Sequence, residues 1–324
     1  IFVCVYARLG VFGIGSIIKY VGFVGIIISC ITSYFNVFSD IRYNTPFVED
    51  YLAYFDIPQK MYEGTEHVER RSDNGYCVEF RNVSFKYPGS EDYALRHVNM
   101  RSTVGERLAV VGMNGSGKTT FIKLMCRLYD PTEGEILLNG VDIRSYNYDE
   151  YLALFSVVFQ DYKLFSFSLA ENVAARADYD AERVTEALRQ SGFDERLESM
   201  PYGINTALYK DFDKNGVEVS GGEAQKIALA RALYKDAPFV ILDEPTAALD
   251  PLAEYEIYSR FSEIVGDKAV VYISHRLSSC RFCDRIAVFD KGQIVQCGTH
   301  SELLADDCGM YSKLWNAQAQ YYQE

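Results

Sequence analysis

The sequence predicts an α/β domain preceded by a transmembrane α-helix, and three observations support this fold class. Residues 107–111 form a short apolar run between Gly105 and Gly112, as a buried parallel strand does. Residues 121–128 follow with the character of a helix. Residues 17–37 are about 21 mainly apolar residues, enough to cross a bilayer core of roughly 30 Å at a rise of about 1.5 Å per residue.

A complete phosphate-binding loop lies between that strand and that helix. Residues 112–119 read Gly-Met-Asn-Gly-Ser-Gly-Lys-Thr and fill every fixed position of the pattern G-x-x-x-x-G-K-[ST]. Glycines at such a junction let backbone N–H groups converge on phosphate oxygens at a helix N-terminus. The alternative is a turn that binds nothing, and the flanking strand and helix argue against it. The residues expected to hold the phosphates are Asn114, Gly115, Ser116, Gly117, Lys118, Thr119 and Thr120.

A second apolar run ends in an acidic pair, Asp243 and Glu244. An acid at the C-terminal edge of a buried strand is well placed to hold Mg²⁺ through water. Glu244 is then positioned to orient and polarise an attacking water. Alone, such a pair could equally end a strand in solvent, but behind a phosphate-binding loop we expect the catalytic role. In the loop, Lys118 would reach the β- and γ-phosphates and the Thr119 hydroxyl would contact Mg²⁺.

From about Tyr76 to the C-terminus the chain resembles the ATPase half of an ABC transporter, because seven motifs occur in the family's order. Besides the phosphate-binding loop, they are the A-loop at 85–89, the Q-loop at 159–161, the signature Val-Ser-Gly-Gly-Glu at 219–223, the Walker B end at 243–246, the D-loop at 248–250 and the switch segment at 273–276. The resemblance implies a P-loop NTPase fold with a RecA-like α/β core, a small antiparallel β portion near residues 76–104, and a helical ABC subdomain between Gln160 and the signature.

The resemblance also implies how ATP and Mg²⁺ would be bound. Tyr87 would stack on adenine, a contact worth about 1–3 kcal/mol by analogy with base stacking. Gln160 would add an oxygen ligand to Mg²⁺ and sense the membrane domain, and His275 would hydrogen-bond the γ-phosphate and the attacking water. A packed tyrosine and a structural histidine are the alternative readings. The implied catalytic residues are Glu244, His275, Gln160 and Lys118, and the implied metal contacts are Thr119, Gln160 and Asp243.

The signature implies that the protein acts as a pair of chains. Ser220 and the N–H groups of Gly221 and Gly222 would form an anion site at the start of a helix over residues 223–234. In the family this site faces the γ-phosphate held by the partner's phosphate-binding loop, and Asp250 of the D-loop also belongs to the nucleotide site. Two ATP molecules then lie head to tail between two domains. We therefore expect a second half-transporter chain, identical or different.

The N-terminal segment predicts insertion into a lipid bilayer. In residues 1–38 only Arg8 and Lys19 are charged, and Lys19 can extend to the headgroups. A signal peptide is disfavoured because the apolar stretch is too long, lacks a basic start and has no small-residue cleavage site. A core helix is disfavoured because nothing nearby is large enough to bury it all round.

Exporter half-transporters fuse six spans ahead of their ATPase domain, and this resemblance sets the expected domain boundaries. Residues 1–58 would hold the end of span five, span six and its cytoplasmic extension. Residues 59–75 would be the linker, and residues 76–324 the nucleotide-binding domain. Pro58 would help to end the long helix. The expected location is the cell membrane, with several spans and the nucleotide-binding domain in the cytoplasm.

Composition argues against some other functions. The formal net charge of −13 disfavours nucleic-acid binding, which requires a basic face. Eight cysteines without framework spacing fit a reducing cytosol. Cys280 and Cys283 form a C-x-x-C with no second pair, on a helix expected after His275, so we expect neither metal binding nor redox chemistry there.

Two residues depart from the family pattern. Lys214 stands where many exporters carry a Glu that helps to contact the membrane domain, and Glu223 replaces the signature Gln, which would weaken contact with ATP bound by the partner. The sequence predicts an ATP-hydrolysing exporter subunit whose substrate, a peptide, a lipid or a drug-like molecule, is unidentified. The alternatives are a soluble ABC ATPase acting on DNA or ribosomes and the ATPase subunit of an importer; the fused apolar segment argues against both.

Overall fold

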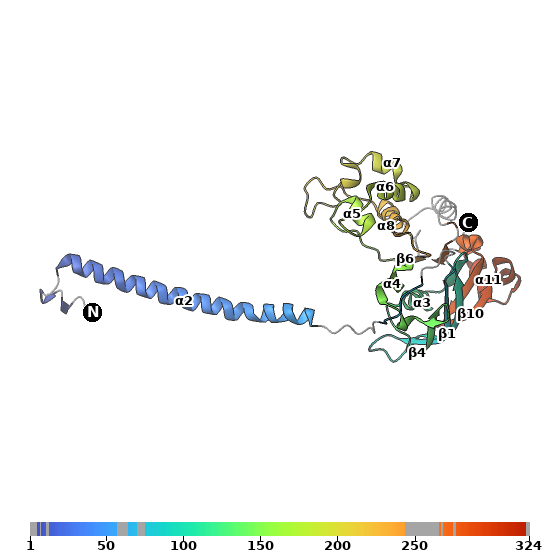
Figure 1. Cartoon of the computed structure of the whole chain (residues 1–324), viewed down its shortest axis with the longest axis horizontal. Helices are drawn as coiled ribbons and strands as arrows, with labels where there is room; N and C mark the ends of the chain where they lie inside the picture. The colour runs from blue at the N-terminus through green and yellow to red at the C-terminus, as the bar shows by residue number, and fades with distance from the viewer. Residues whose placement is uncertain are drawn as a thin grey trace. The chain divides into compact units, whose positions relative to one another are not determined.

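The computed structural model of the chain divides into two compact units, Ile1–Lys60 and Met61–Glu324 (Figure 1). The structure describes residues 5–6, 8–10, 13–56, 64–69, 75–243, 266, 268–274 and 277–321. Residues 1–4 and 7, in the segment expected to hold the end of span five, fall outside this part of the chain, as does most of the expected linker at 59–75.

The first unit contains one long helix, α2 (Ile14–Phe55), of 42 residues. Its most apolar 18-residue window has a mean hydropathy of 1.9, and none of that window is buried. At about 1.5 Å per residue, α2 is roughly 60 Å long, about twice the thickness of a bilayer core. By length and composition it can therefore cross a membrane and continue beyond it. The helix ends at Phe55 with Asp56 as its C-cap, as predicted for the segment before Pro58.

The second unit is built on a six-stranded sheet with the order β10-β9-β3-β8-β7-β6. All neighbouring strands are parallel except β10, which pairs antiparallel with β9. Every residue of β7 and β8 is buried, as in a sheet covered on both faces. The strand predicted at residues 107–111 is β3. The bounds are β3 (Arg107–Gly112), β6 (Phe155–Val158), β7 (Phe239–Asp243), β8 (Ala269–Ile273), β9 (Arg285–Asp290) and β10 (Gln293–Gly298).

A second, antiparallel sheet has the order β2-β1-β4-β5. The predicted antiparallel portion near residues 76–104 accounts for β1 (Cys77–Lys86) and β2 (Tyr93–Thr103) only. The sheet also includes β4 (Glu133–Leu138) and β5 (Val141–Asp142), which follow the phosphate-binding loop in the sequence. The predicted sheet lacked β4 and β5, because β4 pairs with the second edge of β1 across a long sequence separation. Phe80, for example, pairs with Ile136.

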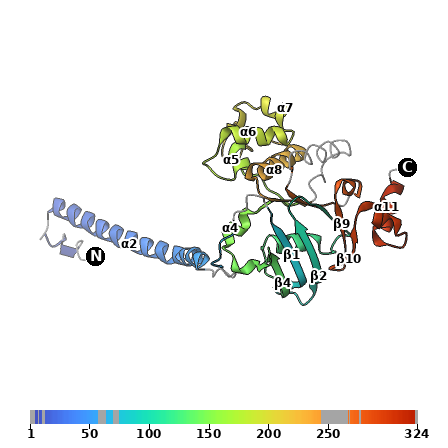
Figure 2. The same cartoon turned by 45° about the vertical axis from the view of Figure 1, so that its right-hand side comes forward.

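The helical subdomain forms a separate layer around its own apolar core, and Figure 2 shows α5, α6, α7 and α8 grouped together. Leu169, Val184, Leu188, Phe193 and Ile227 are buried in this core. Helices α5 to α7 lie between Gln160 and the signature, as predicted, whereas α8 follows the signature and extends the subdomain beyond the predicted bounds. Its helices are α5 (Leu169–Ala174), α6 (Ala181–Gln190), α7 (Asp194–Glu198), η2 (Gly203–Asn205) and α8 (Gly221–Lys235).

The remaining helices flank the two sheets. The phosphate-binding loop leads into α3 (Lys118–Met125), which begins three residues before the predicted helix, so that Lys118 and Thr119 are already helical. The helix expected after His275 is a 3₁₀-helix, η3 (Leu277–Phe282). The others are η1 (Ile143–Ser145), α4 (Tyr148–Ala153), α10 (His300–Ala305) and α11 (Met310–Tyr321).

Candidate nucleotide-binding site

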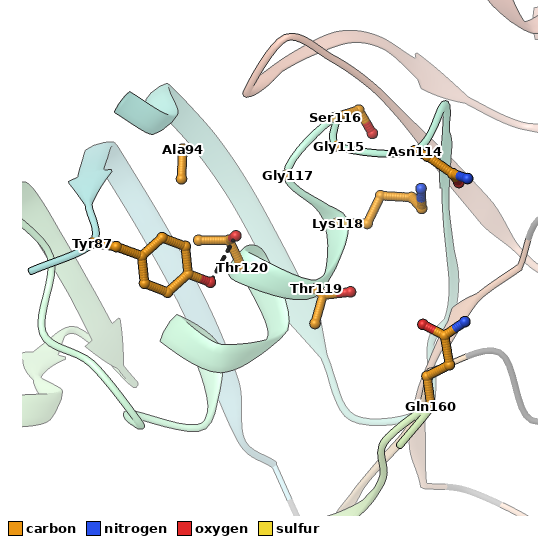
Figure 3. Close-up of a pocket in the computed structure, with 10 residues that line it drawn as sticks. All are labelled: Tyr87, Ala94, Asn114, Gly115, Ser116, Gly117, Lys118, Thr119, Thr120 and Gln160. Carbon is orange, nitrogen blue, oxygen red and sulfur yellow. Dashed lines mark hydrogen bonds between the residues drawn. The ribbon is translucent and has the colours of Figure 1, made fainter. Parts of the chain in front are cut away.

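A pocket of about 580 Å³ lies over the phosphate-binding loop. Figure 3 shows Tyr87 at one end of this pocket and Gln160 at the other, with Lys118 and Thr119 between them. The pocket therefore brings together three motifs that are widely separated in the sequence. It is lined by Tyr87, Ala94, Asn114, Gly115, Ser116, Gly117, Lys118, Thr119, Thr120 and Gln160.

Two glycines of the loop adopt backbone conformations that other residues rarely adopt. Gly112 has φ 151°, and a Cβ there would lie 2.3 Å from the Phe289 carbonyl oxygen. Gly117 has φ 106° and caps α3, and a Cβ there would lie 2.7 Å from Leu95 Cδ2. The loop is thus packed closely against its neighbours, and the first N–H groups of α3, which have no intrahelical acceptors, point out of its start.

Lys118 is held inside the loop. Its side chain is 6% exposed, and Nζ donates hydrogen bonds to the carbonyl oxygens of Gly112 and Met113, each at 3.0 Å. These bonds keep the ammonium group beside the pocket that it lines. A cation fixed among backbone N–H groups at a helix N-terminus is suited to bind phosphate oxygens.

Thr119 and Asp243 are brought into direct contact. The Thr119 hydroxyl donates a hydrogen bond to Asp243 Oδ2 at 3.1 Å, and Asp243 is 1% exposed at the end of β7. Ser116 Oγ is buried and has no hydrogen-bond partner within the described part of the chain. A hydroxyl, a carboxylate and the nearby Gln160 amide are oxygen donors of the kind that Mg²⁺ takes together with phosphate oxygens. The residues present therefore fit a Mg²⁺–nucleotide complex.

Tyr87 lies in the pocket as part of an aromatic cluster. Its ring packs edge-on against Phe85 and Tyr129, with centroids 5.0 and 5.3 Å away. Its hydroxyl and Thr120 Oγ1 are 3.1 Å apart and share a hydrogen bond. These contacts fix the ring beside the start of α3. The ring is thus packed, as the alternative reading has it, and it also lines the pocket. The adenine contact remains a prediction.

The signature lies away from this pocket, whose lining includes none of residues 219–223. Ser220 is exposed and is the N-cap of α8. Its Oγ accepts a hydrogen bond from Glu223 N at 3.3 Å, and Glu223 Oε2 accepts one from Ser220 N at 2.7 Å, which completes a capping box. Glu223 thus supplies half of this cap, a part that the family's Gln can also play.

Glu244, Asp250 and His275 lie outside the described residues, so their catalytic and nucleotide-binding roles remain predictions. Of the C-x-x-C pair, Cys280 is buried, and burial raises the pKa of Cys283 well above its ordinary value. A buried thiol with a raised pKa holds its proton and makes a poor nucleophile or metal ligand.

Sequence reasoning missed Ala94 and Arg196. Ala94 lines the pocket from β2. Arg196 Nε lies 2.9 Å from Glu223 Oε1 and forms an ion pair with it. A three-residue spacing of Ser and Glu signals the capping box from sequence alone. Nothing in the local pattern signals the contact between α7 and the start of α8.

Comparisons with known proteins agree with this geometry. The family model described as ABC transporter matches residues 95–247. The subtilin transport ATP-binding protein SpaT of Bacillus subtilis is 37% identical over 308 residues, which cover 93% of this chain and 49% of that protein. The ATP-dependent lipid A-core flippase of Paraburkholderia xenovorans is 37% identical over 310 residues, covering 95% of this chain and 51% of the relative.

A solved structure is similar to most of the chain. It is that of a bacterial Atm1-family ABC exporter with ATP bound, with a TM-score of 0.77 and 31% identity, covering 86% of this chain and 48% of the other. The chain spans about half the length of the curated relatives it matches. Its fold is that of an ABC ATPase domain, and the chain belongs to the ABC transporter family.

Proposed function

We propose that the chain binds and hydrolyses ATP as the nucleotide-binding part of an ABC exporter, and that hydrolysis drives transport through membrane spans that include α2. The observation that carries this proposal is the pocket in which Lys118, Thr119, Tyr87 and Gln160 come together, with Thr119 bonded to Asp243. That constellation offers sites for a phosphate chain, a divalent cation and a purine at once.

Each residue in this pocket has a distinct part in the proposed reaction. Lys118 and the N–H groups at the start of α3 hold the β- and γ-phosphates, while Tyr87 orients the base. Thr119, Asp243 and Gln160 would hold Mg²⁺, which when bound neutralises charge on the phosphate oxygens. Glu244 orients the attacking water, and His275 contacts that water and the γ-phosphate; both roles rest on the family resemblance.

A second chain completes the proposed site. Ser220 and the N–H groups of Gly221 and Gly222 are at the exposed start of α8 and do not line the pocket of their own chain. They can therefore serve the γ-phosphate held by another copy or by a related half-transporter. We propose a head-to-tail pair in the cell membrane, with several spans and with both nucleotide-binding domains in the cytoplasm.

The transported substrate is proposed only by class. One relative is named for subtilin transport and another as a lipid A-core flippase, and we propose a peptide, a lipid or a drug-like molecule. A soluble ABC ATPase acting on DNA or ribosomes, or a separate importer subunit, fits less well because the exposed apolar helix α2 precedes the domain on the same chain.

Two substitutions test the ATPase assignment in the purified full-length protein. Glu244→Gln should leave ATP binding intact and lower hydrolysis at least about a hundredfold, the range for a positioned base or water-orienting group. Lys118→Ala should instead lose binding itself. Lys313→Ala, an exposed lysine on α11, serves as the control. Near wild-type hydrolysis by Glu244→Gln would contradict the assignment.

A further inference from the structure

The carboxylate of Glu223 lies in the first turn of the signature helix α8, and both of its oxygens are engaged. Oε2 accepts the capping-box hydrogen bond from Ser220 N at 2.7 Å. Oε1 forms an ion pair with Nε of Arg196 at 2.9 Å, although the Nε–H is not aligned for a hydrogen bond. A carboxylate in the first turn stabilises the helix, because its negative charge complements the positive end of the helix dipole. It also places a negative charge within one turn of a proposed phosphate site.

Arg196 is held where it can balance that charge. It lies on the short helix α7, and its Nη1 donates a hydrogen bond to Ser199 Oγ at 3.3 Å. The Ser199 hydroxyl in turn donates to the Arg196 carbonyl oxygen at 2.7 Å. The side chains of Arg196 and Glu223 are 36% and 27% exposed, so solvent screens this pair less than a fully exposed one.

The N–H groups that would meet phosphate remain available in this arrangement. The capping box uses the N–H groups of Ser220 and Glu223. Gly221 and Gly222 provide the first two N–H groups of α8, which have no acceptor within the helix. A Cβ on Gly221 would meet no atom within 4 Å, so the space beside Gly221 is open.

We propose that Arg196 is a positioning residue for ATP that spans two chains: by neutralising Glu223 it lets the start of α8 accept the γ-phosphate held by the second chain. This inference rests on the proposed function. Without Arg196, an uncompensated carboxylate would face a polyanion, and like charges at this range repel appreciably where water is partly excluded. Glu223 then needs Arg196, whereas a Gln at the same position would not.

A purely structural role makes a different prediction. If Arg196 only joined α7 to α8, removing it would loosen the helical subdomain whatever the residue at 223. The charge-balancing role predicts instead that the effect of losing Arg196 depends on the charge at residue 223 and on ionic strength. The two roles therefore separate in a double-mutant cycle.

The experiment measures KM for ATP and kcat of the full-length protein at low and high salt. Arg196→Met should raise KM roughly tenfold at low ionic strength, less at 1 M salt, and change kcat little. Arg196→Lys, which keeps the charge, should restore most of the affinity. In the Glu223→Gln background, Arg196→Met should have almost no effect on KM. If Arg196→Met does not fold, Arg196→Gln replaces it in the same cycle.

Other outcomes overturn the inference. An unchanged KM in Arg196→Met, or an equal rise of KM in both backgrounds and at both salt concentrations, assigns Arg196 a structural role only. A wild-type protein that hydrolyses no ATP overturns the proposed function and this inference together. Wild-type hydrolysis combined with either of the first two results overturns this inference alone.

Discussion

At the scale of single residues, Lys118, Thr119 and Asp243 hold positions suited to bind a phosphate chain and a cation. Lys118 is fixed by two loop carbonyls, and Thr119 is bonded to Asp243 across the start of α3. Arrangements held by the fold before the ligand arrives cost little ordering entropy on binding. The pocket is therefore pre-organised at its proposed phosphate end.

The proposed adenine end of the pocket depends on Tyr87. The packing of its ring against Phe85 and Tyr129 fixes the position of the ring, and its hydroxyl shares a hydrogen bond with Thr120. Stacking on adenine needs only an aromatic face. The Tyr87 hydroxyl bonds to Thr120, a residue of the protein, and is not needed for stacking. Removing the ring should therefore affect nucleotide affinity far more than removing the hydroxyl.

We predict that Tyr87→Ala weakens ATP binding by roughly 1–3 kcal/mol, while Tyr87→Trp and Tyr87→Phe bind nearly as wild type does. Equilibrium binding of a fluorescent ATP analogue measures the affinity. Tyr93→Ala is a matched control, because Tyr93 is a nearby tyrosine at the start of β2 that does not line the pocket. If Tyr87→Ala and wild type bind ATP equally, the adenine contact lies elsewhere.

At the scale of elements, the entry into α3 depends on its cap, Gly117. Gly115 and Gly117 both have positive φ, 75° and 106°. A Cβ on Gly115 would meet nothing within 4 Å, but a Cβ on Gly117 would lie 2.7 Å from Leu95 Cδ2 and 2.9 Å from the Ala94 carbonyl oxygen. The two glycines thus share the backbone requirement and differ in how closely β2 packs against them.

This difference gives a stability prediction. Gly115→Ala should lower the free energy of unfolding by about 1–2 kcal/mol through backbone strain alone. Gly117→Ala should lower it by a further 1–3 kcal/mol or so, because β2 must shift. Thermal unfolding of the full-length protein without nucleotide gives the comparison. Equal melting temperatures for the two variants would contradict this, because they would show that β2 can shift without lowering the free energy of unfolding.

The elements also show what the sequence could predict. The strand and helix around the phosphate-binding loop follow from local pattern, since glycines bound a short apolar run, and both are confirmed as β3 and α3. The pairing of β4 with β1 could not be predicted because it joins segments that are distant in the sequence. The local pattern of a strand does not indicate which other strand it pairs with. Tyr87 and Gln160 are also distant from the phosphate-binding loop in the sequence, so they were assigned to the pocket only through the family resemblance. Arg196 was missed because its contact with Glu223 is likewise between distant segments.

At the scale of the whole molecule, the proposed two halves of a nucleotide site do not meet within the part of the chain that the structure describes. The pocket holds Lys118, while Ser220 caps α8 outside its lining. A self-sufficient nucleotidase would be expected to close its site with its own residues. The separation fits the proposal that the complete site forms between chains, which is the central claim of the proposed function.

Mixed dimers test this claim most directly. A Lys118→Ala chain loses the phosphate-binding loop, and a Ser220→Arg chain loses the signature, so in a homodimer each substitution disables both sites. A dimer containing one chain of each kind has one doubly damaged site and one site built from an intact loop and an intact signature. ATPase activity and nucleotide crosslinking are measured on affinity-purified mixed dimers and on each pure mutant.

The account predicts that mixed dimers recover ATPase activity above both pure mutants. If the two sites can hydrolyse ATP only together, mixed dimers should still retain ATP crosslinked at one site per dimer. Neither recovery nor one-site binding would contradict pairing of this chain with a second copy of itself and would favour a different partner chain.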